Sequence, residues 1–248
     1  MKDIIHRSPF AVNRNSPIIA FMGTVGSGKS TQMKLLALSL KRGGIRVKVS
    51  SLKSGYLSCI LINLLAKILV GGRKDIYPIR ALIEEKPNVF KKLFKLWIFL
   101  DMISISVQFL ESIYVPKKTR SLILVEEYLP ATIVDYVYFA KTLNIPSAPF
   151  FAIRFILKLI KLGGHMHTIF LDAQDTVLSK RWVQRASPNE TFNYIMMQRS
   201  LLLPIVNKLS SSFSFIDTSS QDVETTFRQI SQIFTEEYNL PRAGKLIF

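Results

Sequence analysis

With 248 residues, 48% of them hydrophobic, the chain can bury the core of one large domain and is excluded from the disordered class. Its formal net charge of +16 favours nucleotides, nucleic acid or an anionic membrane surface as partners, although no basic run is long enough for a nucleic-acid-binding tail. The chain has one cysteine, Cys59, which excludes an internal disulfide framework. We find no uncharged run that could cross a bilayer and no apolar stretch typical of a secretory leader. We therefore expect a cytoplasmic protein.

Apolar runs and helical patterns alternate along the chain between an irregular lead-in, residues 1–16, and a tail, residues 239–248. Strands are expected over 17–22, 45–51, 121–126, 167–172 and 213–218. Helices are expected over 29–42, most of 56–114, 131–143, 147–162, 174–185, 188–209 and 220–238. Ser219 or Ser220 is expected to cap the last helix. Residues 17–238 therefore predict one α/β domain, with a five-stranded parallel sheet and helices on both faces, whose ligands bind beyond the carboxyl ends of the strands.

The first expected strand leads directly into a phosphate-binding pattern. Residues 23–30, GTVGSGKS, match G-x-x-x-x-G-K-[ST] at every fixed position, and a helix follows. Glycines there let backbone N–H groups and the helix N-terminus cradle the phosphates of a purine nucleoside triphosphate. Lys29 is expected to reach the β- and γ-phosphates, Ser30 to ligate Mg²⁺ and Thr31 to support the α-phosphate. The predicted nucleotide-binding residues are Gly23, Thr24, Val25, Gly26, Ser27, Gly28, Lys29, Ser30 and Thr31.

The third expected strand ends in two carboxylates, Glu126 and Glu127. This is the position of a Walker B element, with glutamate in place of the usual aspartate. We interpret Glu126 as a residue that holds the Mg²⁺ shell, and Glu127 as one that orients a nucleophile or pairs with a lysine. Tyr128 is a candidate to face the acceptor. The alternative is two exposed glutamates at a strand end.

A basic segment follows the fourth expected strand. Arg181 and Arg185 are four residues apart and share one helix face, and Lys180 precedes them. We expect residues 174–190 to form a lid whose arginines fold over the triphosphate and neutralise the charge that develops during transfer. A solvated basic face is the alternative interpretation.

Together these features resemble the thymidylate kinase family of P-loop nucleoside monophosphate kinases. The resemblance is carried by the P-loop with its flanking strand and helix, by Asp172 with arginines nine and thirteen residues later, and by Arg199 in the next helix. It implies a three-layer P-loop NTPase fold and an ATP- and Mg²⁺-dependent transfer of phosphate to a small anionic acceptor, a (deoxy)nucleoside monophosphate. It also implies that residues 217–219 lie near the adenine, and that the helices at 93–114 are candidates for a homodimer contact.

The acceptor half departs from the family pattern. Glu126 and Glu127 replace an Asp-Arg pair, and Asp101 stands near the position of an acceptor-phosphate arginine. Lys53 or the cluster of Lys91 to Lys95 is the candidate substitute. Three alternatives therefore stay open: a P-loop ATPase or ATP-binding switch, a kinase acting on a nucleic-acid end, and a peripheral membrane protein.

Overall fold

The structure, a computed structural model, describes residues 18–55, 60–71, 77–119, 121–145, 149–183 and 192–238. The expected lead-in and tail, and the end of the expected lid with Arg185, lie outside the described residues.

Five strands form one parallel sheet in the order β2-β3-β1-β4-β5, which confirms the predicted sheet. The strands are β1 (Ile18–Gly23), β2 (Val47–Ser51), β3 (Leu122–Glu126), β4 (Met166–Asp172) and β5 (Ser212–Asp217). Both faces of β1 and β4 are buried, as their continuous apolar sequences require. The last strand begins and ends one residue before the expected range, because the pairing of β4 with β5 runs from His167–Ser212 to Asp172–Asp217.

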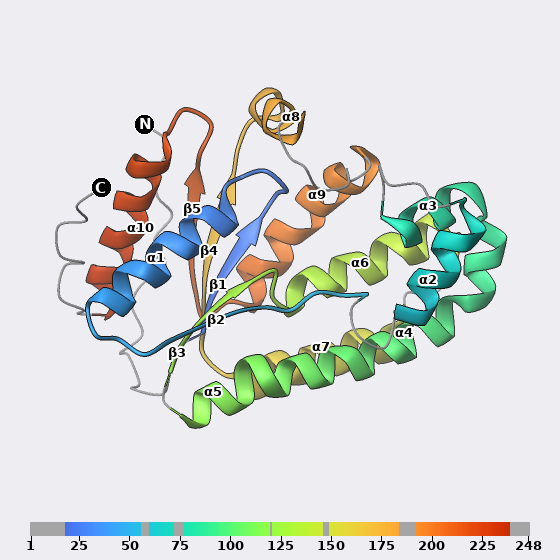
Figure 1. Ribbon diagram of the computed structural model, residues 1–248, viewed down its shortest axis with the longest axis horizontal. Coiled ribbons are helices and arrows are strands. Elements are labelled where there is room, and N and C mark those ends of the chain that lie inside the picture. The colour runs from blue at the N-terminus through green and yellow to red at the C-terminus, as the bar shows by residue number, and fades with distance from the viewer. Residues whose placement is uncertain are drawn as a thin grey trace.

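Helices cover both faces of the sheet, and the alternation of side chains along each strand decides which helices meet which face (Figure 1). Ile19 and Phe21 of β1 pack in one cluster with α1 (Lys29–Arg42) and α10 (Val223–Tyr238). Ile18 and Ala20 point the other way, into a larger cluster. The longer helices in this cluster are α4 (Pro87–Phe109), α6 (Leu129–Thr142), α7 (Phe150–Gly163) and α9 (Phe192–Leu209), and shorter helices add to it.

Shorter elements complete the described fold: α2 (Ile60–Leu69), α3 (Pro78–Glu85), the π-helical turn η2 (Leu110–Tyr114), α5 (Val115–Lys118) and α8 (Asp175–Val183). Proline occupies the first turn of α3 and of α4, where its missing N–H costs no helical bond. The expectation that Ser219 or Ser220 caps the last helix is wrong. The helix begins later, and the Asp222 carboxylate accepts the backbone N–H of Thr225 at 2.7 Å.

One helical stretch among the described residues, Pro87–Lys118, is long and apolar enough to cross a membrane, with a mean hydropathy of 1.7. Its inner face packs into the larger core cluster through Phe90, Trp97 and Ile105, and 44% of its most apolar window is buried. Core helices of globular proteins pass the same test of length and composition.

The chain places β3 on one side of β1 and β4 on the other. The crossover direction therefore reverses at β1, and the carboxyl ends of β1 and β3 border the crevice where parallel α/β sheets bind ligands. The P-loop follows β1, and the two glutamates end β3, so both features lie at this edge.

Candidate functional site

The loop between β1 and α1 has the backbone of a phosphate-binding loop. Gly23 has φ +129°, and a Cβ there would lie 1.8 Å from the Leu171 carbonyl oxygen, so the position requires glycine. Gly28 has φ +96° and precedes α1 without any side-chain cap, and nothing lies within 4 Å of its Cβ position. The first turn of α1 is therefore open to an anion.

Lys29 bends back over this loop. Its ammonium donates to the carbonyl oxygens of Gly23 and Thr24 at 3.0 and 2.9 Å, and the residue is 6% exposed. The Ser27 hydroxyl is buried and has no hydrogen-bond partner in the described part of the chain. A buried, unpaired donor beside an open helix terminus fits the phosphates of a nucleotide.

Ser30 and Glu126, the two predicted magnesium ligands, lie in contact. The Ser30 hydroxyl donates to Glu126 Oε1 at 2.5 Å and joins the first turn of α1 to the end of β3. The described residues contain no group of three metal-ligating side chains. Mg²⁺ in nucleotide sites needs none, because one or two protein oxygens and the substrate phosphates suffice. The hydroxyl and the carboxylate fit that ion.

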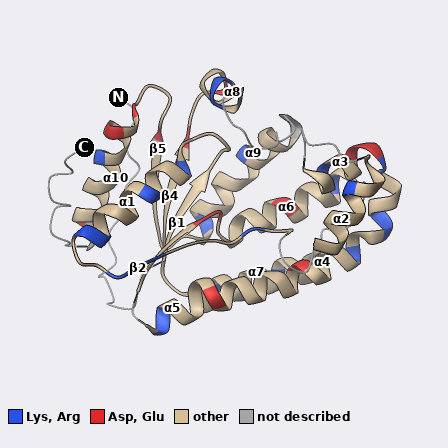
Figure 2. Ribbon diagram, viewed as in Figure 1, with Lys and Arg blue, Asp and Glu red and all other residues tan. Residues whose placement is uncertain are grey.

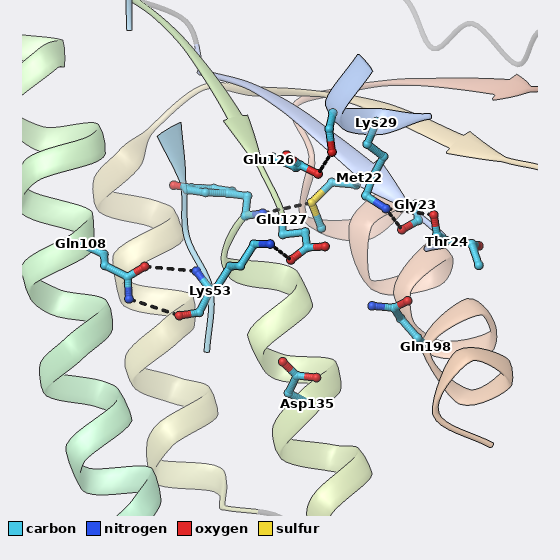
Figure 3. A network of polar contacts seen from close by, with 12 residues as sticks. Met22, Gly23, Thr24, Lys29, Lys53, Gln108, Glu126, Glu127, Asp135 and Gln198 are labelled. Carbon is cyan, nitrogen blue, oxygen red and sulfur yellow. Dashed lines mark hydrogen bonds and ion pairs between the residues drawn. The ribbon is translucent and has the colours of Figure 1, made fainter. Parts of the chain in front are cut away.

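Glu127 turns away from Glu126 and forms an ion pair with Lys53 at 3.4 Å (Figure 3). Its φ of +54° is rare for a residue with a side chain, and its N–H donates to the Phe21 carbonyl at 3.3 Å. The charge of Glu127 raises the pKa of Lys53, burial acts against it, and Glu126 adds to the rise. The expectation that Glu127 pairs with a lysine is confirmed.

The loop that carries Lys53 is held by α4. The Gln108 side chain exchanges two hydrogen bonds with the Lys53 backbone, both at 3.2 Å. Asp101 accepts from Gly55 N at 2.6 Å, Tyr136 Oη at 2.8 Å and Ser54 Oγ at 3.0 Å. Burial raises the pKa of the Asp101 carboxyl to about 6, and these three hydrogen bonds oppose the rise. Asp101 therefore anchors the loop.

Lys91 lies far from this edge of the sheet. Its ammonium is 3.5 Å from the Asn144 carbonyl, just beyond the C-terminal end of α6, whereas Glu127 lies just before the N-terminal end. Fourteen helical residues span roughly 21 Å. The proposal that the cluster of Lys91 to Lys95 replaces the acceptor-phosphate arginine is therefore wrong for Lys91, while Lys53 does lie at the site.

A third carboxylate and an arginine lie below Glu127, and the sequence interpretation missed both. Asp135 of α6 is 3.5 Å from the guanidinium of Arg80 and accepts from Tyr194 Oη at 2.7 Å. Arg80 lies over the Tyr194 ring, 3.3 Å from its centroid. Burial raises the pKa of Asp135, and Arg80 opposes this effect. An arginine inside the apolar run of α3 was the signal that could have revealed this pair.

Helix α8 packs on the back of the P-loop. Arg181 donates to Thr218 Oγ1 at 3.0 Å, to Thr218 O at 2.9 Å and to Gly26 O at 3.3 Å. Trp182, which the sequence interpretation missed, donates its indole N–H to Val25 O at 2.7 Å. Arg181 is thus held beside the loop, with Thr218 of the expected adenine-side segment next to it. Its predicted role over the triphosphate, shared with Arg185, stays a prediction.

The ends of β4 and α9 brace the same loop. Asp172 accepts from Thr24 Oγ1 at 2.7 Å and from Arg199 Nε at 2.9 Å. Arg199 also pairs with Asp175, so it ties α9 to the start of α8. The expectation that Tyr128 faces an acceptor is wrong: the residue is fully buried, and a Cβ on Gly163 of α7 would lie 2.6 Å from its hydroxyl.

No protein-family model matches the chain, and no curated protein matches its sequence. Solved structures do match. A thymidylate kinase from Candida albicans has 16% sequence identity and a TM-score of 0.54, over 90% of this chain and 92% of that one. A thymidylate kinase from Ehrlichia chaffeensis has 18% identity and a TM-score of 0.50, over 89% and 99%. This likeness spans nearly both lengths, and the chain has the thymidylate kinase fold.

Proposed function

We propose that the chain is an ATP- and Mg²⁺-dependent phosphotransferase of the nucleotide-kinase type. The observation that carries the proposal is the hydrogen bond between Ser30 and Glu126, because it joins the P-loop hydroxyl to the acidic end of β3 in the loop that also holds Lys29. The single cysteine and the likeness to nucleotide kinases support a cytoplasmic location.

The residues of the P-loop divide the work of phosphoryl transfer. Backbone N–H groups at the start of α1 would hold the phosphates, and Lys29 would offset charge on the transferred group. Mg²⁺, held by Ser30 and Glu126, supplies further neutralisation of the phosphate oxygens when bound. Arg181 and Arg185 are the proposed lid arginines.

The resemblance to thymidylate kinases favours a nucleoside-type acceptor, in that family a (deoxy)nucleoside monophosphate. Figure 3 shows Lys53, Glu127, Asp135 and Gln198 on one side of Lys29, and we place such an acceptor in this region. The second candidate is an ATPase or ATP-binding switch. Glu127 favours it, because a carboxylate near the P-loop can activate water.

Product analysis tests the proposal. The purified chain is incubated with Mg·ATP and a panel of nucleosides and nucleoside monophosphates, and products are separated by ion exchange. We expect a phosphorylated acceptor, and at least a 100-fold lower rate in Lys29→Ala, because a cation is lost from the transferring phosphate. Lys34→Ala, which removes an exposed lysine from the same helix, is the matched control. ADP and free phosphate without a phosphorylated acceptor would establish the ATPase instead.

A further inference from the structure

We infer that the group phosphorylated by this site is a hydroxyl of a neutral, nucleoside-like acceptor, and that Glu127 is the base that takes its proton. The inference rests on the proposed phosphotransfer and deepens it by naming the acceptor class. It departs from the monophosphate that the family resemblance favours.

The charges on the acceptor side do not suit a phosphate. Among the described residues, Glu126, Glu127 and Asp135 place carboxylates in this region, and Figure 2 shows acidic segments at the end of β3 and on α6. Lys53 is paired with Glu127, and Arg80 with Asp135. A phosphomonoester carries up to two negative charges and needs cations that are not already matched. It would instead meet like charges.

The backbone holds Glu127 where a base is needed. Glu126 accepts from Ser30 on the metal side of the site, and the positive φ of Glu127 directs the second carboxylate to the opposite side. A left-handed conformation is costly for a non-glycine residue, and such strained positions concentrate at functional sites. Figure 3 places the Glu127 carboxylate between Lys53 and Lys29, on the side of the site where Asp135 and Gln198 also lie.

The chemistry of the acceptor decides whether a base is required. A phosphate oxygen is already anionic at neutral pH and can attack without losing a proton. An alcohol must lose its proton as it attacks. Here the acceptor oxygen forms a bond to the γ-phosphorus of ATP, the bond to the β,γ-bridging oxygen breaks, and ADP leaves. The hydroxyl proton passes to Glu127 and then to water, as in other phosphotransferases that use a carboxylate base.

An unpaired group indicates what else the acceptor carries. The Gln198 amide donates to Tyr194 Oη at 3.1 Å, but its carbonyl oxygen is buried and has no hydrogen-bond partner among the described residues. A buried acceptor without a partner is costly, and a ligand N–H or O–H would satisfy it. The Tyr194 ring itself is covered by the Arg80 guanidinium. A nucleoside carries such donors on its base and its sugar.

The decisive experiment pairs each deoxynucleoside and nucleoside with its own monophosphate, using Mg·[γ-³²P]ATP. We expect label in nucleosides and none in diphosphates. Glu127→Gln, which keeps the size of the side chain and removes the base, should lower nucleoside phosphorylation about 100- to 10,000-fold. Glu127→Asp should retain part of the activity. Glu111→Gln, an exposed glutamate of η2, is the matched control.

A binding measurement without ATP gives an independent readout. In calorimetry, Glu127→Gln should tighten monophosphate binding by about tenfold, because one like charge is removed, and leave nucleoside binding nearly unchanged. Labelled diphosphates from the unmodified chain, with rates unchanged or raised in Glu127→Gln, would overturn this inference and leave the phosphotransferase standing. Nucleoside phosphorylation that survives in Glu127→Gln would overturn the role of the base. Free phosphate as the only product would overturn both proposals.

Discussion

The carboxylate of Asp101 offers a quantitative test of how the acceptor side is held together. The side chain is fully buried in α4, where burial raises its pKa from 3.8 to about 6 against the pull of three hydrogen bonds. At 1.36 kcal/mol for each pH unit, this difference amounts to about 3 kcal/mol against the charged form. The folded chain therefore keeps a proton between about pH 4 and 6 that the unfolded chain releases. The contribution of Asp101 to stability falls as the pH rises through this window and is constant above it.

Asp101→Asn removes this titration while preserving the shape of the side chain. We expect the stability of Asp101→Asn relative to the unmodified chain to rise by up to about 3 kcal/mol between pH 4 and pH 7. Urea unfolding followed by tryptophan fluorescence measures it, since Trp97 packs edge-on against Tyr136 at 5.8 Å. A difference that is flat with pH, or that favours the unmodified chain as the pH rises, would show that the hydrogen bonds outweigh burial.

Three further predictions concern packing, bracing and assembly. Tyr128→Phe should raise the free energy of unfolding by about 1 kcal/mol in thermal unfolding, because the buried hydroxyl has no partner among the described residues. Gly163→Ala should lower it by about 1–3 kcal/mol, because the new Cβ would meet the Tyr128 hydroxyl. In the double variant this loss should be smaller, since the hydroxyl is gone. A loss of stability in Tyr128→Phe would mean that the hydroxyl is paired. Arg199→Gln should lower the free energy of unfolding by about 1–3 kcal/mol and weaken ATP binding, because Asp172, which accepts from Thr24 of the P-loop, loses its hydrogen bond to Arg199. An unchanged affinity in a nucleotide titration would disprove this role of Arg199. We expect a homodimer through the exposed apolar stripe of α4, where Ile103 is 44% exposed. Ile103→Glu should then halve the molecular mass measured by light scattering. A monomeric unmodified chain would contradict this expectation.

The donor half of the site was predictable from the sequence because its information is local. Gly23, Gly28, Lys29 and Ser30 lie within eight residues between a strand and a helix. The backbone geometry requires the glycines, and the chemistry of a phosphate site favours the lysine and the serine. The parallel sheet was equally predictable from the sequence, because strands buried on both faces have continuous apolar sequences. The ends of the elements were harder to predict. The last helix begins at Val223 because the Asp222 carboxylate accepts the Thr225 N–H, and several serines nearby carry the same capping preference.

The acceptor half depends on contacts between residues far apart in the chain. Lys53 and Glu127 are separated by more than seventy positions, and Arg80 meets Asp135 across two helices. Each residue alone is compatible with a solvated charge. Only the folded chain shows that these cations are matched by carboxylates, and that Trp182 and Arg199 brace the P-loop from behind.

These contacts show how the residue at position 127 sets the charge around Lys53. An arginine at position 127 would add positive charge where an incoming phosphate needs it. With glutamate at position 127, the charge of Lys53 is matched by the ion pair, and the loop that carries Lys53 is hydrogen-bonded to Gln108 and Asp101 of α4. The lysine is therefore less available to a ligand. Glu127→Arg should therefore free Lys53 and strengthen monophosphate binding more than Glu127→Gln does, because it removes one negative charge and adds a positive one. Equal affinities of the two variants in calorimetry would show that a positive charge at position 127 does not reach the bound monophosphate.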